Sequence, residues 1–297
     1  MNSHLKGILI TALGVLIVTP DSLFVRLIDG DPLVTGFWRG LIAGLVVMLA
    51  ILSLQGPRAF AVVFRSGKPG LIYILLIAST APAFALAVTH TSVANVVFIL
   101  AATPIFAAIY SRIFLGEPIG KRMVLTLIAV VIGLGVITYG SAESKIASWQ
   151  GDLWALYIAA AFAAALTAVR KIKDVSMVPA VPFAYIGAAL VLLMFTSPFE
   201  GFEAKWHLYL GHGAMIGAAS CLLTLGPRYI TSAEVSLLVL LESVLAPILV
   251  WWILGEDPGS LAIVGGVIVI SALLVSNYVA INFPKKNRTV SGFKVFD

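Results

Sequence analysis

The sequence predicts an all-α integral membrane protein with ten transmembrane helices, arranged as two inverted five-helix repeats. Three observations predict this fold: the composition, a series of long apolar runs, and the similarity of the two halves of the chain. The 297 residues are 60% hydrophobic and 11% charged, whereas soluble domains are about 45–50% apolar and about 25% charged. So much apolar surface exceeds what a soluble core of this size can bury.

Ten apolar runs approach the length of about 20 residues that crosses a bilayer as a helix. They cover residues 7–28, 33–54, 70–88, 93–114, 121–140, 152–172, 179–197, 207–226, 232–254 and 260–282. Strands of a membrane barrel would be shorter and would alternate in polarity, which these runs do not. The first run follows a basic start that resembles a signal peptide, but it lacks a small-residue cleavage site, so we interpret it as the first span.

The distribution of Lys and Arg predicts that both termini are cytoplasmic, because cytoplasmic loops of membrane proteins are enriched in these residues. All but four of the 19 Lys and Arg fall in the segments that this orientation places inside. The inside residues are Lys6, Arg58, Arg65, Lys68, Arg112, Lys121, Arg122, Arg170, Lys171, Lys173, Arg228, Lys285, Lys286, Arg288 and Lys294. Arg26, Lys145 and Lys205 fall outside, and Arg39 lies within a span.

The two halves of the chain are similar to each other in sequence. An offset of 139 residues pairs Leu-Gly-Glu at 115–117 with Leu-Gly-Glu at 254–256, and Tyr139 with Tyr278. An offset of 144 residues pairs the upstream segments. We therefore predict a first repeat at 1–145, a second at 146–284 and a basic cytoplasmic tail at 285–297. Five spans is an odd number, so the repeats insert in opposite senses, an architecture of secondary transporters. A repeat kept only for packing is the alternative.

These features resemble a known family. The corner Leu-Gly-Glu-Pro at 115–118, its copy at 254–256, Phe-Trp-Arg at 37–39 and the two five-helix halves resemble the EamA-type transporters of the drug/metabolite transporter superfamily, over about residues 7–282. Within that family the chain is most similar to the aromatic and neutral amino-acid exporters. The resemblance implies export of small metabolites from a bacterial inner membrane. The second half departs from the pattern, with Ser243 where the first half has Pro104, and Asp257 inserted before Pro258.

Asp21 is the first candidate site residue, because an ionisable group within the hydrocarbon needs a partner, a wet cavity or a task. It follows Pro20, which removes a backbone donor and loosens the helix there. Asp21 therefore suits a substrate or ion site. The alternative is a structural ion pair with Arg39, since both residues are expected about 10 Å below the outer surface, seven residues from their helix ends.

Glu242 is the second candidate, about halfway along the ninth span. It could contact a substrate ammonium group or carry a proton. The alternative is a protonated carboxyl group bonded to a neighbouring helix. Glu117 and Glu256, just past helix ends, are expected to neutralise the next helix N-terminus rather than to bind substrate.

Further candidates are polar or aromatic side chains in apolar spans. For substrate binding these are Asn95, Phe98, Thr103, Tyr185 and Ser236, and for proton coupling His90 and His212 beside Glu242. Asn and Phe lining a cavity would suit amino-acid side chains, and histidine titrates near neutral pH. Each has a structural alternative: a helix seam for the fourth span, close packing for Ser236, interface anchoring for Tyr185 and a hydrogen-bonded structural role for the histidines.

Several function classes lack their motifs. There is no GxxxxGK[ST] for ATP, no His/Cys/carboxylate cluster with metal-ligand spacing and no GxSxG nucleophile elbow, so we predict no cofactor, no metal and no enzyme activity. The positive charge follows the membrane topology and does not indicate nucleic acid. The expected partners are a small molecule, lipid and protons. The alternatives to amino-acid export are a multidrug exporter of cationic compounds and a membrane-embedded enzyme acting on lipid-linked substrates.

Overall fold

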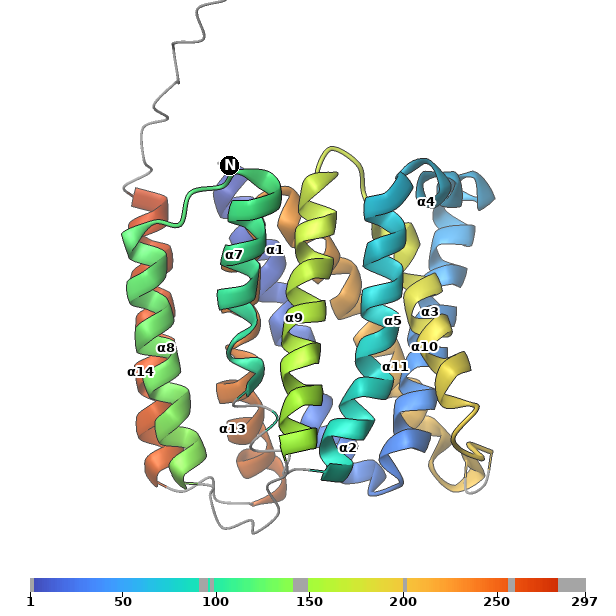
Figure 1. The fold of residues 1–297 in the computed structure, drawn as a ribbon. Helices are drawn as coiled ribbons and strands as arrows, with labels where there is room; N and C mark the ends of the chain where they lie inside the picture. The colour runs from blue at the N-terminus through green and yellow to red at the C-terminus, as the bar shows by residue number, and fades with distance from the viewer. Residues whose placement is uncertain are drawn as a thin grey trace, which may run out of the picture.

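The computed structural model describes residues 3–90, 96, 99–140, 149–199, 202–255 and 260–282, and within these ranges all regular structure is helical. The long helices stand side by side and run between two edges of the molecule (Figure 1). The elements are α1 (Ser3–Val18), α2 (Asp21–Ile28), α3 (Pro32–Gln55), η1 (Pro57–Phe60), α4 (Ala61–Arg65), α5 (Gly67–His90), α7 (Thr103–Leu115), α8 (Lys121–Gly140), α9 (Trp149–Lys171), η2 (Val178–Ala180), α10 (Val181–Leu192), α11 (Phe202–Leu225), η3 (Gly226–Arg228), α12 (Ser232–Val239), α13 (Glu242–Leu254) and α14 (Ser260–Asn282).

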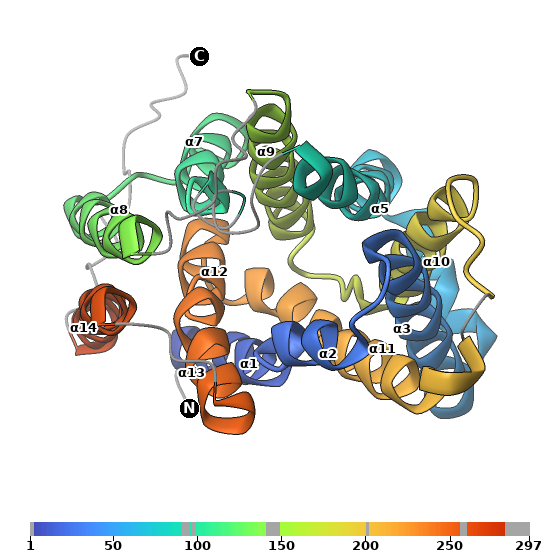
Figure 2. The same cartoon turned by 90° about the horizontal axis from the view of Figure 1, so that it is seen from below.

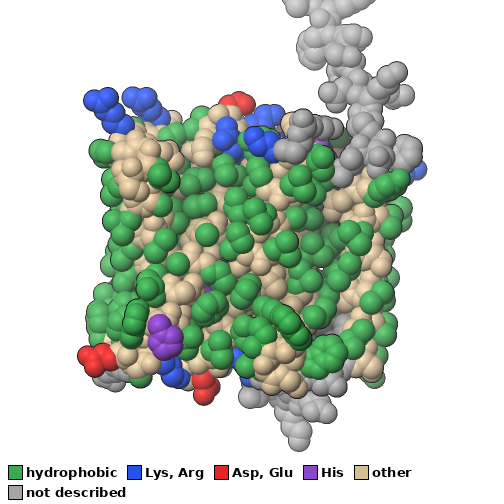
Figure 3. Space-filling view, turned by 180° about the vertical axis from the view of Figure 1, so that it is seen from behind, with side chains coloured by type: hydrophobic (Ala, Val, Ile, Leu, Met, Phe, Trp, Pro, Cys, Tyr) green, Lys and Arg blue, Asp and Glu red, His purple; other side chains and the backbone are tan. Residues whose placement is uncertain are grey.

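Six helical segments of the described chain are long and apolar enough to cross a membrane. They are Ser3–Ile28, Pro32–Gln55, Gly67–Phe84, Trp149–Lys171, Phe202–Arg228 and Ser232–Leu254, and shorter apolar helices lie at Thr103–Leu115, Val178–Leu192 and Ile263–Val279. On the face shown in Figure 3, the flank between the two edges is covered largely by hydrophobic side chains, and more Lys and Arg are visible at the edge drawn uppermost than at the opposite edge. A multi-pass membrane protein is thus supported, whereas the number of ten spans stays a prediction.

The helix boundaries follow the sequence repeat. Helices α7 and α13 each have 13 residues, and they begin at Thr103 and Glu242, which the offset of 139 pairs. Each ends at a glycine with a left-handed backbone, φ 68° at Gly116 and φ 75° at Gly255. Glycine adopts this conformation without the steric penalty of a Cβ atom. Gly116 and Gly255 are therefore paired helix stops.

Helix packing joins the two halves to each other. α5 packs on α9 in the way that α11 packs on α1, and α3 packs on both α10 and α11. The repeat relates the first two pairs, because α1 corresponds to α9 and α5 to α11. Helices α8 and α14, which follow the two glycine corners, pack on each other at the periphery (Figure 2).

The crossing of α3 and α11 is close because of a glycine. A Cβ atom added at Gly213 would lie 2.5 Å from Ile42 Cβ, so no larger residue fits without a shift of the helices. Small residues at such crossings let helix backbones approach in membrane proteins. The neighbouring His212 is thereby brought close to the helices that carry the candidate ion pair.

An aromatic cluster fixes the connection between α10 and α11. Trp38 stacks on Phe202 at a centroid distance of 4.0 Å, and Phe202 stacks on Tyr209 at 5.9 Å. The Trp38 indole Nε1–H donates a 2.7 Å hydrogen bond to the carbonyl of Pro198. Buried Trp usually finds such a partner, and this one ties the first half to the second at the edge opposite the N-terminus.

Candidate functional site

The first span is broken where the sequence predicts a loosened helix. α1 ends at Val18, Pro20 precedes α2, and Asp21 is the first residue of α2. Proline at this place removes a backbone donor, and a carboxylate in the first turn is favourable because of the partial positive charge of a helix N-terminus. Asp21 therefore lies at a discontinuity inside the apolar segment Ser3–Ile28.

Asp21 is held by two basic side chains from two other helices. Arg39 Nη2 of α3 lies 3.1 Å from Asp21 Oδ2, within ion-pair distance, as expected from the sequence. His212 Nε2 of α11 contacts Asp21 Oδ1. The carboxylate thus links α2 and α3 of the first half to α11 of the second.

His212 has unused hydrogen-bonding capacity. The residue is fully buried, its ring stacks on Phe24 with a centroid distance of 5.3 Å, and its Nδ1 has no hydrogen-bond partner among the described residues. Arg39 Nε is also buried and has no hydrogen-bond partner among the residues that the structure describes. Buried polar atoms are nearly always hydrogen-bonded, so these two nitrogens are exceptions within the described part of the chain.

Glu242 completes the charged cluster from a second discontinuity. It is the first residue of α13, after a break at Leu240 and Leu241 where the backbone changes to i→i+3 bonds. Electrostatic interactions connect Glu242 with Asp21 and Arg39. Within the described part of the chain its carboxylate forms no hydrogen bond or ion pair. Half-helix ends of this kind form substrate sites in transporters.

Tyr185 lies beside the same cluster. Its hydroxyl bonds Ser220 Oγ at 2.6 Å, and it interacts electrostatically with Arg39. One turn further along α11, Thr224 bonds the hydroxyl of the buried Tyr73 at 2.8 Å. A polar seam therefore extends from the charged cluster along α11.

The other described candidates, Thr103, Ser236 and His90, bond backbone carbonyls close to them in sequence. The Thr103 hydroxyl donates to the carbonyl of Leu100 at 2.6 Å, and the Ser236 hydroxyl donates to the carbonyl of Ser232 at 2.8 Å. Both side chains therefore bond nearby carbonyls of their own chain segment, which matches the packing alternative for Ser236. A ring nitrogen of His90 lies 2.8 Å from the carbonyl of Leu86 on the same helix. Asn95 and Phe98 lie outside the described residues.

Two further carboxylates join the halves near the edge that carries the N-terminus. Glu117 Oε1 lies 2.8 Å from Arg170 Nε, so its role is a cross-half ion pair in addition to its place at the helix stop. Glu234 lies 2.5 Å from Arg122 and 3.2 Å from the His4 ring, and it forms a capping box with Thr231. The sequence carried no signal for these ion-pair partners, because each pair spans more than 50 residues and two repeats.

Comparison with known proteins connects this arrangement with a family. The profile of the EamA-like transporter family matches residues 5–139 and again residues 149–278. The chain belongs to the EamA-like transporter family. The two matches show that the EamA domain is duplicated, as the internal repeat predicts.

A solved structure described as "Crystal structure of protein" is similar to this EamA-like chain over 95% of its length and over 99% of the other chain. The TM-score is 0.78 and the sequence identity is 16%, so the likeness shows a shared fold. A search of curated proteins found no significant match to the sequence. The family assignment makes the chain a transporter of the drug/metabolite type and leaves its substrate to be inferred from the site.

Proposed function

We propose that this transporter exports small amine-bearing metabolites, with aromatic and neutral amino acids as the main substrates, by alternating access. The observation that supports this substrate class is that one cationic and one anionic side chain of the cluster each keep unused hydrogen-bonding capacity. Arg39 Nε and the Glu242 carboxylate are both without a hydrogen-bond partner among the described residues. An α-carboxylate could bind Arg39, whose planar fork suits carboxylates, while the α-ammonium binds Glu242.

The proposed topology has ten spans in a bacterial inner membrane, with both termini cytoplasmic and a cavity between repeats 1–145 and 146–284. The gathering of Lys and Arg at the edge with the N-terminus supports this orientation. The two helix discontinuities at Asp21 and Glu242, one from each repeat, support a substrate site at the interface of the repeats.

A second candidate function is export of cationic compounds. It is favoured by the composition of the cluster: Asp21 contacts both Arg39 and His212, whereas the nearby Glu242 carboxylate contacts no basic side chain among the described residues. An organic cation would supply the missing positive charge, and in its absence Glu242 would hold a proton. Exchange of that proton for the substrate amine would make transport a proton antiport.

Reconstituted liposomes distinguish these functions. Efflux of a panel of radiolabelled amino acids and of a fluorescent cationic dye is measured with and without a pH gradient. Amino-acid flux by the wild type supports the first proposal. Flux of the dye alone favours the second, and no flux of either class would contradict both.

A further inference from the structure

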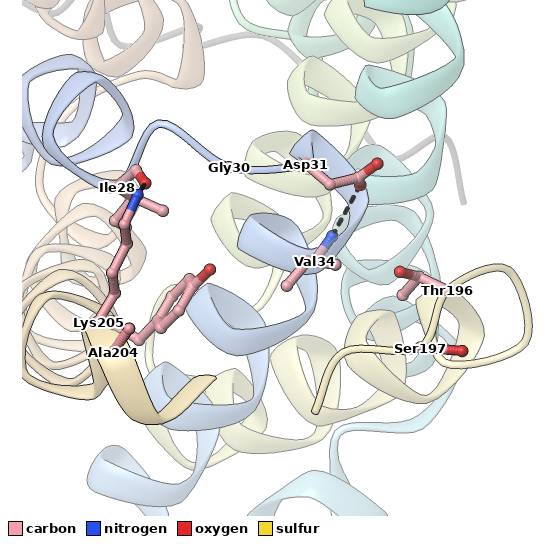
Figure 4. A pocket seen from close by; sticks show the side chains of 9 residues that line it. Ile28, Gly30, Asp31, Val34, Thr196, Ser197, Ala204 and Lys205 are labelled. Atoms are coloured by element: carbon pink, nitrogen blue, oxygen red, sulfur yellow. Dashed lines mark hydrogen bonds between the residues drawn. The ribbon is translucent and has the colours of Figure 1, made fainter. Parts of the chain in front are cut away.

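A pocket of about 520 Å³ lies at the edge opposite the N-terminus (Figure 4). Residues of the loop between α2 and α3, of the connection between α10 and α11 and of the start of α11 line it. Its volume falls in the range of about 300–1,000 Å³ that is usual for small-molecule sites. Both repeats contribute to its wall.

The pocket places opposite charges on opposite walls. Lys205 lies on one wall, and Asp31, Thr196 and Ser197 lie on the other (Figure 4). The Lys205 ammonium donates to the carbonyl of Ile28, and since an ammonium has three donors, two remain for a ligand. Asp31 Oδ1 accepts the backbone N–H groups that cap α3, which leaves Oδ2 available. A zwitterion could place its carboxylate on Lys205 and its ammonium on Asp31.

The pocket lies nearer to this edge than the charged cluster does. Helices α2, α3 and α11 contribute residues to both. Ile28 is seven residues from Asp21 on α2, and Val34 is five residues from Arg39 on α3. Tyr209 of the pocket is three residues from His212 on α11. At 1.5 Å per residue these steps are about 10, 7.5 and 4.5 Å along the helices. The pocket therefore lies about one to two helical turns from the charged cluster along these helices.

We propose that this pocket is a second, outer binding site for zwitterionic metabolites on the export route. The inference rests on the proposed function and deepens it, because the pocket repeats the charge pattern of the cluster: one cationic and one anionic side chain across a small cavity. A zwitterion leaving Arg39 and Glu242 exchanges each ion pair for a matching one before it is fully hydrated. Tyr209, which lines the pocket, stacks on Phe202, and Phe202 stacks on Trp38, so this wall of the pocket is packed against the aromatic cluster.

The test measures protection of a cysteine in the pocket. Ser197, which is exposed, is replaced by Cys in a Cys221→Ala background, and its modification by an external, membrane-impermeant methanethiosulfonate reagent is timed with and without phenylalanine. Phenylalanine should slow the modification. Lys205→Gln or Asp31→Asn should raise the phenylalanine concentration that gives half-maximal protection by about tenfold. Each substitution removes one charge-assisted contact worth about 1.4 kcal/mol.

The chain offers a matched control two residues from Asp31. Asp29→Asn makes the same change of charge at an exposed position that does not line the pocket, and asparagine tolerates its φ of 42°. Asp31→Asn retains the helix cap, since asparagine caps as well as aspartate. Protection should survive in the Asp29→Asn protein.

The outcomes separate the pocket from the proposed function. Protection that weakens only in the Lys205 and Asp31 variants supports the outer site, whether or not phenylalanine is transported. Absence of protection in the Ser197→Cys protein, or equal protection in all variants, overturns it even where liposomes transport amino acids. Failure of transport alone contradicts the proposed function and leaves the result on the pocket standing.

Discussion

Replacing Asp21 by asparagine should destabilise the protein strongly, because it removes the carboxylate that contacts Arg39 inside an apolar helix segment. Removing one partner of a buried ion pair costs about 3–5 kcal/mol. The Arg39 and Asp21 side chains are 33% and 20% exposed, and the pair has one direct contact of 3.1 Å. The amide oxygen of the introduced asparagine could also still accept a bond from His212. We therefore expect the lower end of the range, about 3 kcal/mol.

The double variant Asp21→Asn with Arg39→Gln tests this reasoning. It removes both charges, so most of the lost stability should return, and the coupling energy between the two sites should reach about 2 kcal/mol. Reversible unfolding in mixed detergent micelles measures the wild type, the Asp21→Asn and Arg39→Gln single variants and the double variant. A double variant whose loss of stability relative to wild type equals the sum of the two single-variant losses would refute the ion pair as a stabilising unit and would return Asp21 to the substrate ligands.

Three further predictions concern topology and packing. Cysteine at position 26 should react with an impermeant reagent added outside and cysteine at position 65 should not; the reverse pattern would contradict cytoplasmic termini. Gly213→Val should lower thermal stability and loosen the contact of α11 with α3, since even a Cβ atom would lie 2.5 Å from Ile42, whereas a stable variant would show that the crossing can relax. Ser236→Ala should transport at near wild-type rates, because the hydroxyl bonds its own helix, and loss of flux at unchanged stability would place Ser236 in the substrate path.

Much of the architecture is predictable from the sequence, because the apolar runs and the helix ends depend on short segments and the repeat can be detected by comparing the two halves. Gly116 and Gly255 mark helix ends where the backbone is left-handed, and Pro20 marks the break before Asp21. The nearness of Asp21 and Arg39 followed from their equal expected depth, seven residues from their helix ends. These features depend on neighbours in sequence and could be inferred without coordinates.

The rest of the site depends on contacts between distant parts of the chain. His212 meets Asp21 across 191 residues, and no spacing rule connects them. The break before Glu242 also lacks a local signal, because the preceding residues are leucines that favour a continuous helix. This break corresponds, through the repeat, to the start of α7 in the first half. There Pro104 stands in the first turn of the helix. The outer pocket was likewise not predicted, since its walls come from both repeats.

The central claim is that the charged cluster is the substrate site of a transporter. The most direct measurement compares amino-acid flux in liposomes that contain equal amounts of folded wild-type protein and of the Glu242→Gln variant. Glutamine keeps the size of the side chain and removes its charge, so the account predicts normal folding with flux near the level of empty liposomes. Flux close to wild type in the Glu242→Gln liposomes would contradict it.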